Sequence, residues 1–64
     1  MTNYMRFEKQ QAISVRKGLQ TWGEALCRCA GYLQCMVDMG VMTEDRKTEE
    51  YAMMYERIVG AMHE

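Results

Sequence analysis

With 64 residues and a formal net charge of −1, the chain is long enough for one small domain and lacks the strong positive charge typical of nucleic-acid-binding domains. Its longest apolar run is far shorter than the ~20 residues that a membrane-spanning helix needs, and an odd number of cysteines does not suit a disulfide framework. We therefore expect a cytoplasmic, all-α protein of one domain (residues 1–64), without a membrane segment and without metal ions or other cofactors.

Two signals predict a break in the N-terminal half of the chain. Arg16 and Lys17 followed by Gly18 resemble the basic last turn and the C′ glycine with which many helices end. Thr21, with Glu24 three residues later, has the form of a capping box at the start of a new helix. Together these signals favour a compact three-helix domain with a turn at Gly18 to Thr21, which we keep as the alternative fold.

The apolar pattern favours a continuous helix instead. Its phase runs from Ala12 and Val15 to Leu19 and Trp22 without a slip, whereas a loop usually resets the phase. We therefore predict one long first helix over about residues 4–39, bent near one of its glycines, as half of an antiparallel helical hairpin.

The steadiest apolar stripe passes through this predicted helix at steps of three and four residues, which is typical of a helix that buries one face against partner helices. A domain of about 60 residues buries only ~60% of the surface that its unfolded chain exposes, so a lone hairpin leaves apolar surface uncovered. We therefore expect two hairpins to pair as a homodimeric helical bundle. This core stripe comprises Val15, Leu19, Trp22, Leu26, Cys29, Leu33, Met36 and, from the second helix, Ile58.

The end of the long helix is marked more clearly. Gly40 follows Met39 as a C′ glycine, and Thr43 precedes two acidic residues as the N-cap of the next helix. We predict a turn over residues 40–43 and a second helix over about residues 44–62. A turn this short makes the two helices antiparallel neighbours.

No residue pattern in the sequence predicts catalysis. General acid–base and nucleophilic chemistry need a positioned pair or triad, and the only histidine, His63, is one residue from the end of the sequence. Cys27, Cys29 and Cys35 do not have the spacing of a zinc site, so we interpret them as small, reduced side chains. We therefore expect a protein that is not an enzyme.

Charge is unevenly divided along the sequence. Residues 1–37 have five bases and two acids, hence +3, whereas residues 38–64 have three bases and seven acids, hence −4. Complementary flanks on neighbouring helices, within one chain or between chains, explain this division most simply. The alternative is a small transcriptional regulator whose basic N-terminal half contacts nucleic acid. Its candidate contacts are Arg6, Lys9, Arg16 and Lys17.

Methionine is unusually frequent, with eight in 64 residues, six of which come after residue 35. Methionine adapts to irregular surfaces and is over-used at binding faces. These side chains and the neighbouring tyrosines fall on more than one helix face, so a hairpin cannot cover all of them. We therefore expect a protein-binding module: an adaptor, a regulator or a stoichiometric inhibitor of a larger protein, of the kind that phages and mobile elements often encode. Its candidate partner surface comprises Met39, Val41, Met42, Tyr51, Met54 and Tyr55.

Overall fold

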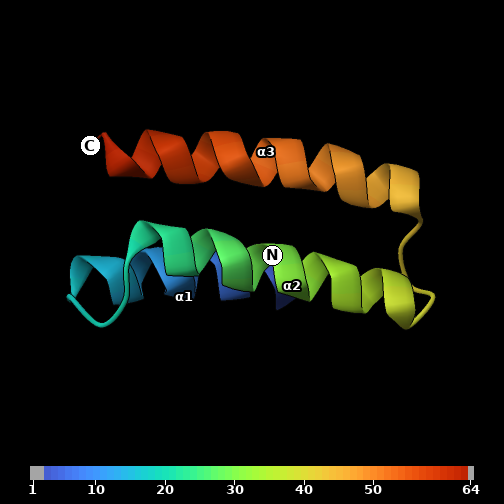
Figure 1. The fold of residues 1–64 in the computed structure, drawn as a ribbon, viewed down its shortest axis with the longest axis horizontal. Coiled ribbons are helices and arrows are strands. Elements are labelled where there is room, and N and C mark those ends of the chain that lie inside the picture. The colour runs from blue at the N-terminus through green and yellow to red at the C-terminus, as the bar shows by residue number, and fades with distance from the viewer. Residues whose placement is uncertain (1–2, 64) are drawn as a thin grey trace.

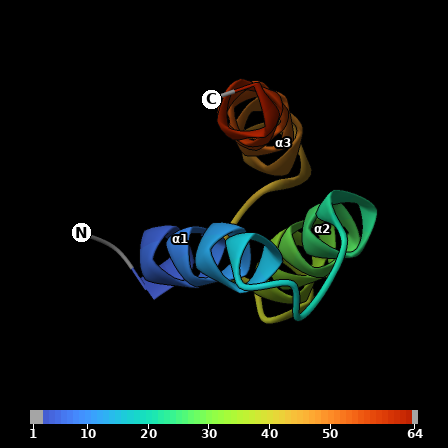
Figure 2. The same ribbon diagram turned by 90° about the vertical axis from the view of Figure 1, so that its left-hand side faces the viewer.

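The structure, a computed structural model, describes residues 3–63, which form three α-helices joined by two short turns. Helix α1 spans Asn3–Arg16, α2 spans Trp22–Asp38 and α3 spans Glu44–Met62, and no strand occurs among the described residues. The all-α prediction is therefore confirmed. Helix α2 packs against both of its neighbours, whereas α1 and α3 meet at few points (Figure 1, and end-on in Figure 2).

The prediction of one long first helix is wrong, because α1 ends at Arg16. It ends in a Schellman motif, in which the Leu19 amide donates to the Ser14 carbonyl at 3.0 Å and the Gly18 amide donates to the Val15 carbonyl at 2.9 Å. Gly18 has a φ of +78°, in the left-handed region that glycine adopts without a steric cost. The turn that follows lies where the three-helix alternative places it.

Helix α2 starts with the capping box expected from its sequence. The Glu24 amide donates to Thr21 Oγ1 at 3.1 Å, and the Thr21 amide donates to Glu24 Oε1 at 3.0 Å. The bond from the Thr21 amide lowers the pKa of the Glu24 carboxyl, because it favours the ionised form. Gln20 ties the turn back to α1, since its Nε2 donates to the side-chain and backbone oxygens of Gln11 at 2.8 and 3.2 Å.

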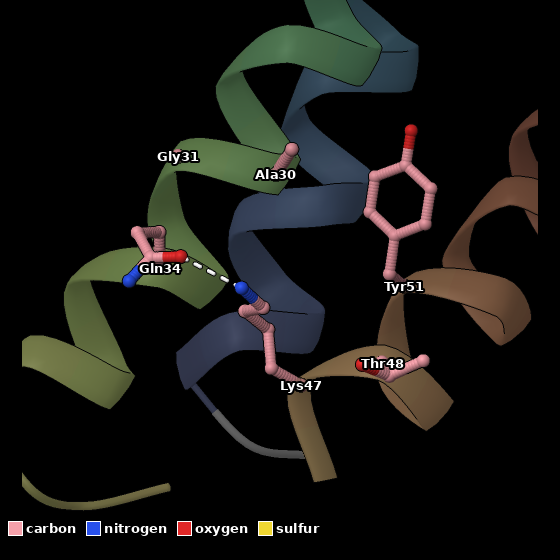
Figure 3. A pocket seen from close by; sticks show the side chains of 6 residues that line it. All are labelled: Ala30, Gly31, Gln34, Lys47, Thr48 and Tyr51. Carbon is pink, nitrogen blue, oxygen red and sulfur yellow. Dashed lines mark hydrogen bonds between the residues drawn. The ribbon is translucent and has the colours of Figure 1, made fainter. Parts of the chain in front are cut away.

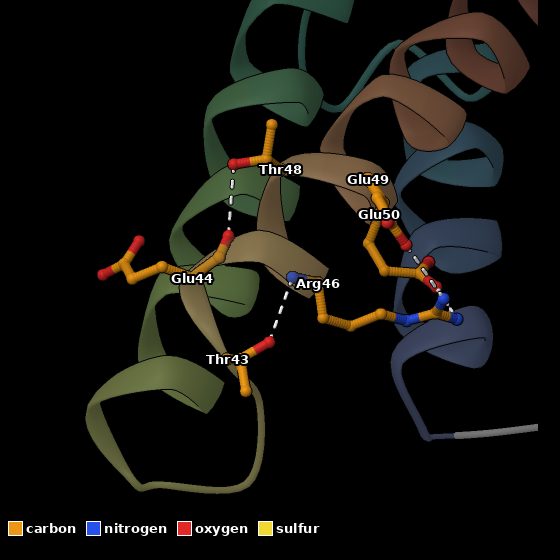
Figure 4. A network of polar contacts seen from close by, with 6 residues as sticks. All are labelled: Thr43, Glu44, Arg46, Thr48, Glu49 and Glu50. Carbon is orange, nitrogen blue, oxygen red and sulfur yellow. Dashed lines mark hydrogen bonds and ion pairs between the residues drawn. The ribbon is translucent and has the colours of Figure 1, made fainter.

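The second turn repeats the chemistry of the first. Helix α2 ends in another Schellman motif, with Gly40 at a φ of +76° and the Val41 amide donating to the Met36 carbonyl at 3.0 Å. Thr43 then caps α3, because its Oγ1 accepts a hydrogen bond from the Arg46 amide at 3.1 Å (Figure 4). Each turn therefore has glycine just after one helix and threonine just before the next.

The core between the helices is small. Its buried hydrophobic residues are Tyr4, Ala25, Cys29, Leu33, Met54 and Ile58. Within the core stripe, Trp22, Leu26 and Met36 are half-buried against these side chains, and Val15 is partly buried on α1. Leu19 of the stripe is not part of this core: its side chain is 75% exposed, because it lies in the turn and not on a helix face. Most of the stripe is thus covered within one chain, because α1 folds back onto α2.

Candidate protein-binding surfaces

The three cysteines lie in different surroundings. Cys29 is fully buried in the core, whereas Cys27 and Cys35 are exposed. Burial, reinforced by the nearby Glu8 carboxylate, raises the pKa of the Cys29 thiol from 9.0 to about 11. Between these two values the folded chain holds a proton that the unfolded chain releases, so stability falls as the pH rises through this window. Within residues 3–63, no group of three or more His, Cys, Asp or Glu side chains is placed to hold a metal ion.

We expect two of the three thiols to react quickly with Ellman's reagent in the folded protein near neutral pH. Cys27 and Cys35 are accessible, whereas reaction at Cys29 requires a core opening that costs ~3 kcal/mol or more, which slows it at least ~100-fold. The slow phase should vanish in Cys29→Ser and should become fast in concentrated guanidinium. Equal rates for all three thiols in the native protein would show that the core opens freely around Cys29.

The structure divides the predicted partner surface between the exterior and the core. Met54 is fully buried, because it lies four residues before Ile58 on the inward face of α3, so its assignment to a partner surface is wrong. The other five side chains remain wholly or partly exposed: Met39, Val41 and Met42 around the α2–α3 turn, and Tyr51 and Tyr55 on α3. The turn residues line one hollow and Tyr51 lines another.

We call the first hollow the methionine groove. It lies where the start of α1, the C-terminal half of α2 and the α2–α3 turn meet, and it has a volume of about 540 Å³. Its apolar lining consists of Tyr4, Met5, Tyr32, Met36, Met39, Val41 and Met42. The Tyr32 ring is held in place by aromatic contacts, with centroid distances of 5.5 Å to Tyr4 and 4.8 Å to Phe7. The groove therefore combines a fixed aromatic residue with adaptable methionine walls.

Charged side chains border the groove along α3. Arg46 and Glu50 both line it, and their ion pair measures 2.5 Å from Nη2 to Oε1. The other terminal nitrogen of the guanidinium, Nη1, lies 3.3 Å from Glu49 Oε2 (Figure 4). A small hollow formed by Tyr32, Cys35, Met36 and Met39 shares three residues with the groove. An apolar centre with a charged rim is the composition expected of a protein-binding surface.

The second hollow lies in the seam between α2 and α3 (Figure 3). It has a volume of about 440 Å³ and is lined by Ala30, Gly31, Gln34, Lys47, Thr48 and Tyr51. Lys47 Nζ donates to Gln34 Oε1 at 2.8 Å across one end of it. Of its lining residues only Tyr51 offers a large apolar side chain, so this seam is a weaker candidate for binding than the methionine groove.

The candidate nucleic-acid contacts are all at the surface. Arg6, Lys9 and Arg16 lie on the outward face of α1, and Lys17 follows in the turn. The only acid of α1, Glu8, is turned inward and binds Arg57 of α3, with distances of 2.6 Å from Nε to Oε1 and 2.8 Å from Nη2 to Oε2. The outward face of α1 is therefore basic without an intervening acid.

Comparisons with protein families, with curated proteins and with solved structures give no match to this chain. The geometry of its surfaces is therefore the basis for inferring a function. None of the helices within residues 3–63 combines the length and the apolar character needed to cross a membrane.

The ion pair between Glu8 and Arg57 is the feature of the surface that the sequence analysis missed. The Glu8 side chain is only 10% exposed, whereas that of Arg57 is 40% exposed. The hydrogen bond to Glu8 raises the pKa of the Arg57 guanidinium, because it favours the charged form. Burial, followed by the charge of Glu8, raises the pKa of the Tyr4 hydroxyl next to the pair. The pair therefore fixes α1 against α3 at a point where few other contacts join them.

Proposed function

We propose that this chain is a small, non-enzymatic protein-binding module that receives apolar side chains of a partner protein in the methionine groove. The observation that carries the proposal is the placement of Met5, Met36, Met39 and Met42. Four of the methionines within residues 3–63 line one open groove, and Met54 is the one methionine of this range that lies in the buried core. Flexible thioether side chains on an exposed concave surface suit a partner whose shape they must follow.

The lining of the groove favours a protein partner of a particular kind. Met39 and Val41 are 65% and 64% exposed, so covering them removes apolar surface from water and stabilises the complex. An amphipathic helix with an apolar stripe fits such a groove, and its polar flank would meet Arg46 and Glu50 at the rim. By covering a surface of that partner, the module would act as an adaptor, a regulator or a stoichiometric inhibitor.

A charge placed in the groove should abolish partner capture and leave the fold intact. Met39→Glu costs the folded chain little, because the side chain is 65% exposed. In a complex, the new carboxylate loses water without gaining a partner, which costs ~3 kcal/mol and lowers affinity ~100-fold. Proteins captured from the producing cells by each variant are identified by mass spectrometry, and the affinity of each captured partner is then measured by calorimetry.

The matched control is Met62→Glu, which changes a methionine of 45% exposure far from the groove. Both variants should keep the helical circular-dichroism spectrum of the wild type. A partner bound by the wild type and by Met62→Glu, but lost with Met39→Glu, supports the proposal. Partners that bind Met39→Glu as tightly as the wild type would reject the groove as the binding site.

A further inference from the structure

We propose that copies of this chain associate head to tail, with the outward face of α1 in one copy against the outward face of α3 in the next. The proposal does not depend on the methionine groove. Most of the core stripe is covered inside one chain, so we expect a second copy to use other faces. Two stripes of opposite charge and similar spacing on α1 and α3 provide such faces.

The basic stripe runs along α1. Arg6, Lys9, Ile13 and Arg16 follow one another at steps of three and four residues, which places them on one face of the helix. All four side chains are exposed, including Ile13 at 41%. Since Glu8 is turned inward, no acid interrupts this face.

The acidic stripe runs along α3, on the side away from Met54 and Ile58. Asp45, Glu49 and Glu56 are spaced by four and seven residues and are all exposed. Met53, which is 39% exposed, lies between the second and third of these acids. Each stripe therefore combines three charges of one sign with an exposed apolar side chain.

Two ion pairs among the described residues bear on this division of charge. Arg46 is shared between two acids, Glu49 and Glu50, so that cluster remains negative. The ion pair that joins α1 to α3 places the acid, Glu8, on the basic helix and the base, Arg57, on the acidic helix. It therefore makes the outward face of α1 more basic and that of α3 more acidic than the sequences of the helices suggest.

The two stripes match when the helices are laid parallel. The positions that then face each other are Arg6 and Asp45, Lys9 and Glu49, Ile13 and Met53, and Arg16 and Glu56. At 1.5 Å per residue, the basic stripe is about 15 Å long and the acidic stripe about 16.5 Å. Charged pairs flanking an apolar contact resemble the flanks of paired helices in coiled coils.

The contact has to join different copies. Helices α1 and α3 lie on different sides of the molecule (Figure 2). The residues of each stripe are exposed and lie on the side of their helix opposite its buried residues. One copy therefore cannot pair its own stripes, and the contact between copies is heterologous. Because exposed ion pairs are individually weak, association is expected at high protein concentration and low salt.

Charge reversal tests this directly by sedimentation velocity. Arg6→Glu with Lys9→Glu gives a chain whose two stripes are both acidic, and Glu49→Lys with Glu56→Lys gives one whose stripes are both basic. Each double variant alone should stay monomeric, because like charges meet. An equimolar mixture should associate, because every reversed stripe then meets a stripe of opposite charge. Wild-type association should weaken at least ~10-fold between low salt and ~0.5 M NaCl.

Several controls keep the outcome clear. Helical circular dichroism should be unchanged in each variant, and the single variants Lys9→Glu and Glu56→Lys replace any double variant that unfolds. Met39→Glu should associate like the wild type, so a failure of the proposed groove function leaves this result intact. Loss of association in Met39→Glu would instead show that the groove joins the copies and would overturn the proposal.

Two further results would also overturn it. The first is a mixture of the charge-reversed variants that remains monomeric. The second is a wild-type chain that stays monomeric at high protein concentration and low salt. If the α1 face of that monomer binds labelled duplex DNA, measured by fluorescence anisotropy and lost with Arg6→Glu and Lys9→Glu, the basic stripe is assigned to phosphate contacts instead.

Discussion

Leu33→Ala should lower the free energy of unfolding by about 3–5 kcal/mol, the largest loss among the leucine truncations. The Leu33 side chain is fully buried and belongs to a core cluster that also includes Tyr4 of α1 and Met54 of α3. With so few buried hydrophobic residues, the core cannot close over the cavity that truncation leaves. Because small domains are only marginally stable, the variant should be largely unfolded at room temperature. Denaturant titration followed by circular dichroism measures the loss.

The other two leucines are matched controls, because Leu19, Leu26 and Leu33 are spaced by seven residues. In a continuous helix all three would occupy the same heptad position and would respond alike. In the three-helix structure Leu19 is 75% exposed, so Leu19→Ala should change stability by less than about 0.5 kcal/mol. Leu26 is half-buried, and Leu26→Ala should cost about 1–2 kcal/mol. Equal losses at Leu19 and Leu33 would contradict the break in the helix.

The local sequence predicts both turns. The regular spacing of apolar residues across the first turn led instead to the prediction of a continuous helix. Gly18-Leu19-Gln20-Thr21 and Gly40-Val41-Met42-Thr43 share the pattern glycine, hydrophobic residue, any residue, threonine. In both segments the glycine has a positive φ and the hydrophobic amide closes a Schellman motif. The Schellman motif itself calls for a hydrophobic residue after the glycine, and Leu19 fills that position. That Leu19 also fits the helical spacing of the apolar residues is a coincidence. Capping chemistry was therefore a better guide here than unbroken periodicity.

The candidate site could be predicted only in part. The sequence indicates a methionine-rich surface, and Met39, Val41 and Met42 do line an open groove. It does not indicate which methionine of α3 turns inward, because Met53 and Met54 are adjacent and the choice depends on how α3 rotates against α2. Helix α1 lines the groove only because the chain turns back after Arg16. The prediction of one long helix, which has no such turn, could not place α1 there.

The ion pair between Glu8 and Arg57 could not be predicted from the sequence, for a similar reason. The two residues are 49 positions apart and come together only when α1 lies beside α3. One signal was available: Glu8 is the single acid of its helix, flanked by polar and apolar residues. A lone acid in a basic segment needs a base from elsewhere, but nothing local identifies which of the three bases of α3 supplies it.

Removing the base from this pair should cost more stability than removing the acid. Arg57→Met leaves the Glu8 carboxylate, only 10% exposed, without its guanidinium, and should lower the free energy of unfolding by about 2–3 kcal/mol. Glu8→Leu leaves Arg57, which at 40% exposure is solvated by water, and should cost about 1 kcal/mol. Denaturant titration of both variants at neutral pH measures the two losses.

The double variant separates the two physical contributions. If most of the loss in Arg57→Met comes from a buried carboxylate without a partner, Glu8→Leu with Arg57→Met should be more stable than Arg57→Met alone, because two apolar side chains then replace the pair. The losses are therefore expected to be strongly non-additive, with a coupling energy of ~1–3 kcal/mol. Additive losses would show that the two charges do not interact in the folded chain. In that case the contact that holds α1 against α3 is the apolar packing of Tyr4 and Ile58, and not the ion pair.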